Sequence, residues 1–171
     1  MRAAAIAMVM LLGSTLAWGM ELELGVPVKT LDDAKISVFR VLPDGCFRRF
    51  YRESLCLHTG LTFARIDIKD AESVHFLGFS TFAKFRSGPF WNRIGFGIGV
   101  FDKRTEEVKA KWDFNLSIQY GIMVAESVGL TIGWEHLSNG RSFAERLGLD
   151  NLWPDYNDGG NALLLGVVMK W

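Results

Sequence analysis

The sequence predicts an all-β fold, an eight-stranded antiparallel transmembrane β-barrel. Three observations carry this prediction. In the C-terminal half, apolar residues alternate with polar or small ones over runs of about ten residues, the length that a tilted strand needs to cross a bilayer. The apolar positions are large and often aromatic, whereas the alternate positions are rich in glycine, as expected for a lipid-facing surface around a narrow lumen. The chain also ends on an aromatic residue, Trp171, like the C-terminal signal of outer-membrane barrels.

The N-terminal 19 residues have the features of a secretory signal peptide. Arg2 gives a positively charged start, residues 3–12 form a continuous apolar run, and Ala17 and Gly19 are small residues at positions suited to cleavage. The apolar run is too short for a helix that spans about 30 Å of hydrocarbon. We therefore expect an exported protein in which residues 20–171 form a single barrel domain of the outer membrane.

Eight strands follow from the alternation and from the available length. We expect them at residues 20–28, 34–42, 54–67, 73–85, 90–101, 111–123, 128–138 and 162–171. The last four are the clearest, while the first two and the connection 43–53 have weaker patterns. An exported soluble sandwich is the alternative, but its strands are usually only about 5–6 residues long.

Composition excludes several functional classes. Lys and Arg number 19, as do Asp and Glu, and this balance argues against a nucleic-acid-binding protein. Cys46 and Cys56 are too few for a four-cysteine zinc site, and they leave open either one disulfide or two thiols. No cluster of His, Cys, Asp and Glu has metal-ligand spacing, and no glycine-rich phosphate loop precedes a helix, so we expect neither a metal nor a cofactor.

The connections predict how the barrel is oriented. A short turn at residues 125–127 joins the sixth and seventh strands, whereas residues 139–161 form a long connection between the last two. Outer-membrane barrels have short periplasmic turns and longer extracellular loops. The end of the seventh strand, near His136, should therefore lie at the level of the outer leaflet.

A histidine and a serine end the outward stripe of this seventh strand. The stripe runs Val128, Leu130, Ile132, Trp134, His136 and Ser138, so parity points His136 and Ser138 to lipid. A neutral imidazole that accepts the serine proton would make the hydroxyl a nucleophile for acyl transfer. The alternative is that the strand leaves the membrane here and its polar residues enter the headgroup zone.

The longer motif is more specific. WEHLSNG at residues 134–140, NDGGN at residues 157–161 and the hydrophobic terminal strand resemble the lipid A 3-O-deacylase (PagL) family. The resemblance covers roughly residues 90–171 and implies an eight-stranded outer-membrane esterase acting on the ester at position 3 of lipid A. It implies His136 as base, Ser138 as nucleophile and Asn139 as a contributor to the oxyanion hole.

The sequence departs from the family at the group that orients the histidine. Where the family has a glutamate at the start of the final strand, the best match here is Asn161, which shares the outward parity of Leu163. An amide can hold the tautomer of the imidazole but does not stabilise imidazolium charge as a carboxylate does. The carboxylates of the long connection are alternative partners, namely Glu145, Asp150, Asp155 and Asp158.

Other polar residues have weaker assignments. Arg141 and Arg146 are candidate contacts to lipid A phosphates, but ordinary loop charges are the better explanation of both. His58 and His75 are expected in the barrel wall or lumen, and Glu135 in a polar network of the lumen. The expected partners are therefore lipopolysaccharide as substrate and the surrounding outer-membrane lipids, with a homodimer left open. A non-catalytic small barrel with a structural or binding role is the alternative function.

Overall fold

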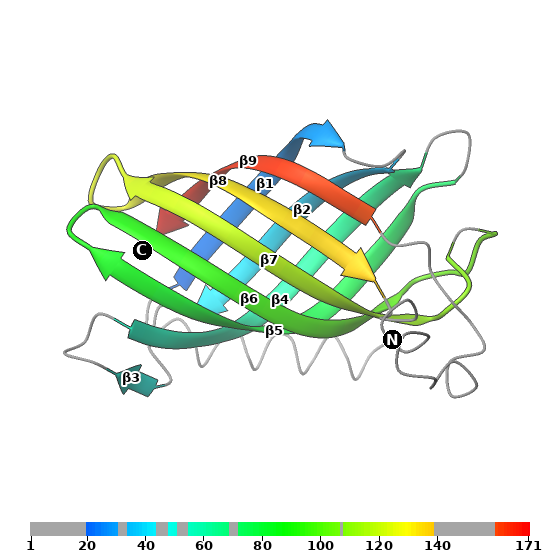
Figure 1. Ribbon diagram of the computed structural model, residues 1–171, viewed down its shortest axis with the longest axis horizontal. Helices are drawn as coiled ribbons and strands as arrows, with labels where there is room; N and C mark the ends of the chain where they lie inside the picture. The colour runs from blue at the N-terminus through cyan, green and yellow to red at the C-terminus, as the bar shows by residue number, and fades with distance from the viewer. Residues whose placement is uncertain are drawn as a thin grey trace, which may run out of the picture.

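The computed structural model describes residues 20–30, 34–43, 48–50, 55–68, 72–106, 108–138 and 160–171. They form nine strands (Figure 1): β1 (Met20–Thr30), β2 (Ala34–Pro43), β3 (Arg48–Phe50), β4 (Leu55–Ile68), β5 (Val74–Ser87), β6 (Phe90–Phe101), β7 (Trp112–Met123), β8 (Val128–Ser138) and β9 (Gly160–Lys170). The predicted signal peptide lies outside the described residues. No helix in the described part of the chain is long and apolar enough to cross a bilayer.

Eight of these strands close into an antiparallel barrel, which confirms the predicted fold class. Each strand pairs with its neighbours in the order β2-β1-β9-β8-β7-β6-β5-β4, and β2 pairs with β4 to close the sheet. The three-residue β3 pairs only with the first residues of β4 and takes no part in the closure. Closure matters in a bilayer because it leaves no strand edge with unpaired backbone groups.

The two ends of the barrel differ in their connections. At one end, called here the turn end, β5 joins β6 through Gly88 and Pro89, and β7 joins β8 through residues 124–127. Gly88 has a φ of 58°, a backbone conformation that residues other than glycine rarely adopt. This conformation permits the two-residue turn. At the opposite end, called the loop end, β8 ends at Ser138 and β9 begins at Gly160 (Figure 1).

The outward face of the barrel is a continuous apolar belt. Large side chains that are about half exposed recur at every second position of the strands, among them Leu24, Phe79, Phe96, Tyr120, Leu130 and Leu165. An exposed apolar surface of this extent is unusual for a soluble protein and matches the band that lipid covers in membrane barrels.

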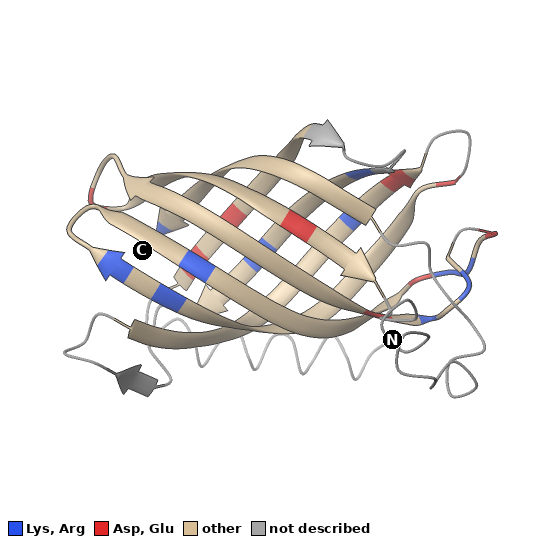
Figure 2. Ribbon diagram, viewed as in Figure 1, with Lys and Arg blue, Asp and Glu red and all other residues tan. Residues whose placement is uncertain are grey.

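The lumen is filled by a polar network of paired charges to which all eight strands of the closed barrel contribute, β9 through the ion pair of Lys170 with Glu21 at 3.4 Å. Arg93 bonds to Glu21 at 2.8 Å and also to Glu23, and Arg40 bonds to Glu23 at 3.2 Å and to Glu135. Further links pair Lys84 with Glu21 at 2.5 Å, Asn115 with Glu135 at 3.4 Å, and Ser80 with Asn115 at 3.1 Å and with Thr62 at 2.8 Å. Figure 2 shows positive and negative positions interspersed along the strands. Buried charges are tolerated here because each has an opposite partner.

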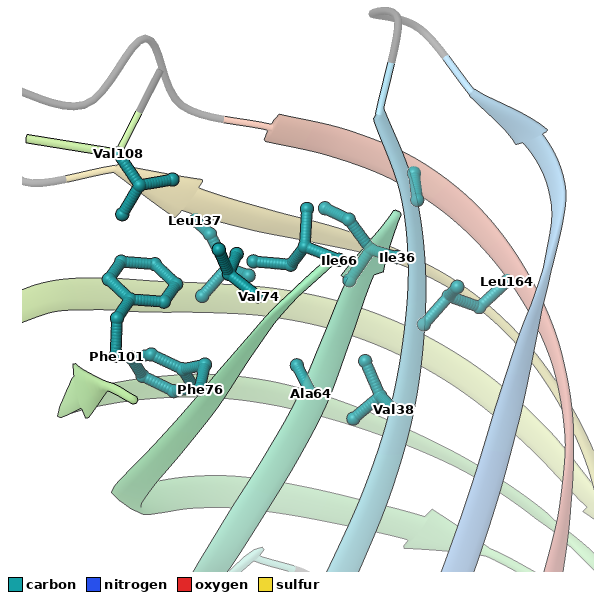
Figure 3. Packing of buried hydrophobic residues seen from close by; sticks show 11 residues of the cluster. Ile36, Val38, Ala64, Ile66, Val74, Phe76, Phe101, Val108, Leu137 and Leu164 are labelled. Carbon is teal, nitrogen blue, oxygen red and sulfur yellow. The ribbon is translucent and has the colours of Figure 1, made fainter. Parts of the chain in front are cut away.

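An apolar cluster occupies the lumen nearer the loop end. It comprises Ile36, Val38, Ala64, Ile66, Val74, Phe76, Phe101, Val108, Leu137, Ala162 and Leu164 (Figure 3). Val108 comes from the connection between β6 and β7, so this loop folds over the end of the barrel and contributes to the packing. Side chains therefore fill the lumen in both regions.

The boundaries of all eight predicted strands lie within two residues of those observed. The ranges 90–101 and 128–138 are confirmed, whereas β3 was not expected. The last strand begins at Gly160 rather than at residue 162 because Gly160 and Asn161 pair with Leu137 and His136 across β8. The question left open for the cysteines is answered at Cys56, which is disulfide-bonded.

Candidate active site

Three of the residues expected to form the site are brought to one place on the outer wall of the barrel. His136 and Ser138 lie on β8, and Asn161 lies on β9 directly opposite His136 in the antiparallel register. All three side chains are half-buried and face outward at the loop end, whereas their neighbours Glu135, Leu137 and Ala162 are buried inside.

A hydrogen bond fixes the orientation of His136. Its Nδ1 lies 2.9 Å from Oδ1 of Asn161. An amide oxygen only accepts hydrogen bonds, so Nδ1–H of the imidazole is the donor. In the neutral ring, Nε2 then carries the lone pair and is able to accept a proton from a hydroxyl group.

The two inward residues that flank His136 hold this part of β8 from the lumen side. Glu135 accepts hydrogen bonds from Arg40 and from Asn115, and Leu137 packs in the apolar cluster. The strand carrying the histidine is therefore anchored by ion pairs and by packing on one face while its other face presents the imidazole.

The immediate surroundings of His136 on the outer wall are apolar. The indole of Trp134 stacks on the imidazole, with ring centroids 5.5 Å apart and an angle of 11° between the planes. Leu116 pairs with His136 across β7, and Phe114 pairs with Ser138. Phe114 in turn packs against Phe96 and Trp112, at centroid distances of 5.4 and 5.3 Å. The hydroxyl and imidazole thus lie beside an aromatic surface suited to an acyl chain.

The sequence reasoning missed the role of this aromatic neighbourhood. The sequence places Trp134 in the lipid-facing stripe and in the motif of residues 134–140 without a role at the histidine, although its position two residues before His136 on the same face brings the two rings within reach of each other. Phe114 lies near the site because β7 pairs with β8 and places it opposite Ser138, and Trp112 lies two residues before it on the same outward face.

Several predicted site residues lie outside the described part of the chain. These are Asn139, Arg141, Arg146 and the alternative acids Glu145, Asp150, Asp155 and Asp158. Their assignments stay predictions. Among the described residues, no group of His, Cys, Asp and Glu is arranged to hold a metal ion.

The other two histidines lie away from this place. His58 is buried in the wall at β4, and its Nδ1 is 3.5 Å from the carbonyl oxygen of Pro43. His75 faces outward on β5, with β6 and β7 between it and β8. Its backbone N–H and its imidazole both contact Asp102, at 2.9 and 2.8 Å, and these bonds hold the pKa of that carboxyl below its usual range. A carboxylate-bound histidine therefore exists in the barrel, but on a different part of the wall.

Comparison with known proteins identifies the fold. No protein-family model matches the sequence, and no curated protein matches it. Among solved structures, the chain is similar to the outer membrane enzyme PagL, with a TM-score of 0.59 over 88% of this chain and 98% of that one, at 16% sequence identity. It is also similar to Neisserial surface protein A (NspA), with a TM-score of 0.49, coverage of 90% and 95%, and 15% identity. The chain therefore has the fold of the outer-membrane barrel PagL, and its chemistry must be argued from its own residues.

Proposed function

We propose that this protein is a cofactor-free serine esterase of the outer membrane that removes the 3-O-linked acyl chain of lipid A. The observation that carries the proposal is the hydrogen bond from His136 to Asn161, because it leaves Nε2 free to act as a base on the strand that also carries Ser138. The resemblance of residues 134–140 to the deacylase motif supplies the substrate class.

The position of the site supports a substrate held in the membrane. The residues face outward at the loop end. Because the short turns of outer-membrane barrels are periplasmic, the turn end should face the periplasm and the loop end the cell exterior. Polar side chains that face lipid cost free energy, and such residues in membrane proteins usually have a function. A lipid in the outer leaflet would reach this surface with its acyl chains along the apolar belt and its sugar at the rim.

The proposed reaction has two halves. Ser138 Oγ attacks the ester carbonyl carbon while its proton passes to His136 Nε2, and the tetrahedral intermediate then breaks the bond to the sugar oxygen, which takes the proton. Water next attacks the acyl-enzyme, again with His136 as base, and the fatty acid leaves as Ser138 regains its proton. Asn139 is proposed to stabilise the oxyanion.

Mass spectrometry of lipid A tests this proposal. Lipid A from a Gram-negative host that expresses the protein should lose one 3-hydroxyacyl mass, and Ser138→Ala or His136→Ala should abolish that loss. Matched controls are Ser37→Ala and His75→Ala, which remove a serine and a histidine from the outward face of other strands. Unchanged lipid A with an abundant, folded wild-type barrel would contradict the proposal and favour a non-catalytic structural or binding role.

A further inference from the structure

The imidazole of His136 is restrained by a second contact besides its hydrogen bond. The Asn161 bond acts within the plane of the ring, at Nδ1. The Trp134 indole covers one face of the ring in a nearly parallel arrangement, 5.5 Å between centroids. A hydrogen bond alone leaves the ring able to pivot about that bond, whereas a face contact opposes this rotation.

Trp134 is itself held in place by the sheet. It pairs with Ile118 on β7 and with Leu163 on β9, and all three side chains lie on the outward face. Its neighbour Glu135 is bonded inside the barrel to Arg40, so the strand cannot easily rotate to carry the indole away from the histidine. The stacked arrangement is therefore a fixed feature of the wall.

Among the described residues, the outward neighbours of His136 carry no negative charge that would compensate the imidazolium formed during serine attack. Asn161 is neutral, and so are Leu116, Trp134 and Ser138, the other described residues that pair with or flank it on the outward face. The face of an indole carries the negative part of its quadrupole and attracts a cation placed over it. This attraction is largest where water is partly excluded, as on the wall of a barrel.

We infer that Trp134 is a positioning residue of the esterase, which holds the plane of the His136 ring and stabilises its cationic form in the transition state. This inference rests on the proposed function. In the proposed division of roles, Asn161 selects the tautomer, Trp134 supplies the electrostatic stabilisation that an amide does not, and Ser138 carries out the attack.

Two variants at Trp134 and one control test the inference. Trp134→Leu removes the aromatic face, Trp134→Phe retains a smaller one, and Tyr120→Leu removes an outward aromatic of β7 that lies beside Ile132 rather than beside the histidine. Heat-modifiable migration on gels checks that each variant folds. Trp134→Met serves in place of the leucine variant if the latter does not insert.

The first measurement is independent of activity. In spectra of the protein with isotope-labelled histidine in detergent micelles, the ring protons of His136 should be displaced upfield by the stacked indole, with the signal assigned through His136→Gln. Trp134→Leu should abolish this displacement and Tyr120→Leu should preserve it. An undisplaced His136 signal in the wild type would show that the rings do not stack and would overturn the inference.

The second measurement is turnover of purified lipid A. We expect Trp134→Leu to lower kcat by about tenfold to thirtyfold with little change in KM, the size of a partly desolvated cation–π contact. Trp134→Phe should recover much of this loss, and Tyr120→Leu should match the wild type. Full kcat in Trp134→Leu, or an equal loss in Tyr120→Leu, would overturn the positioning role while leaving the esterase intact. An inactive wild type with a displaced His136 signal would instead refute the proposed function itself.

Discussion

Glu135 and His136 are consecutive residues whose side chains lie on opposite sides of the barrel wall. Glu135 is buried and bonded to Arg40 in the lumen, whereas His136 faces outward and is bonded to Asn161. The alternation of a β-strand thus joins the internal ion-pair network to the candidate site through a single peptide bond. Substitutions in the lumenal ion-pair network should therefore alter the position of His136 on the outer wall.

Asn161 is expected to control the rate of the proposed reaction. Asn161→Ala should lower activity on purified lipid A without unfolding the barrel, because it removes the 2.9 Å bond at the rim. Asn161→Glu should raise activity, since a carboxylate adds charge stabilisation to the same hydrogen bond.

The same two variants test the alternative partners in the long connection. If one of those carboxylates orients His136, removing it should cost more activity than Asn161→Ala, and Asn161→Glu should help little. Equal rates for the wild type and both Asn161 variants would exclude Asn161 from the site.

Arg40 is expected to be essential for stability because it bonds to two buried carboxylates. Arg40→Met leaves Glu23 and Glu135 without this partner and should lower the free energy of unfolding by about 3–5 kcal/mol. Urea titration of the protein refolded in lipid vesicles measures the loss. The double variant Arg40→Met with Glu135→Gln should be less destabilised than the single one, and additive losses would contradict this coupling.

Gly97 is expected to tolerate no side chain. A Cβ at this position would lie 2.6 Å from the carbonyl oxygen of Phe79 and would also collide with the side chains of Ser80 and Asn115. Gly97→Ala should therefore reduce the yield of folded, heat-modifiable barrel. Gly25→Ala is the matched control, because the nearest atom there is the flexible Cδ1 of Leu164 at 3.2 Å. Equal yields of the two variants would refute the packing argument.

The apolar belt predicts where the protein is found in the cell. After fractionation it should be recovered with the outer membrane, and it should migrate differently on gels before and after boiling, as closed barrels do. Recovery as a soluble periplasmic monomer would contradict both the membrane assignment and the proposed substrate.

The architecture was predictable because alternation is a local signal that survives over a full strand. Phe90–Phe101 and Val128–Ser138 match their predicted bounds, since large apolar residues and glycine or polar residues alternate there from end to end. Arg48–Phe50 is too short to show a period, and its three residues are strand only because β4 continues beyond β2 and offers them a partner.

The sequence predicts the parity of the site and Asn161 as the partner of His136, but it does not predict the aromatic contact of the histidine. Counting along β8 places His136 and Ser138 outside, and the same parity was assigned to Asn161 from its distance to Leu163. The stacking of Trp134 on His136 depends instead on the rotamers of both side chains, which neighbours on β7 and β9 restrict. These restrictions come from residues of β7 and β9 that are distant from β8 in the sequence, so the pattern of β8 alone does not predict the rotamers.

The filled lumen distinguishes this barrel from barrels that form water-filled pores. Its described interior holds buried Arg40, Arg93 and their carboxylate partners in one region and the apolar cluster in another, so side chains occupy the space that ions would have to cross. Planar bilayers that contain the protein should accordingly show no steady ionic current. A cell could then carry many copies in its outer membrane without leaking small solutes, so the permeability barrier would set no limit on the abundance of the protein.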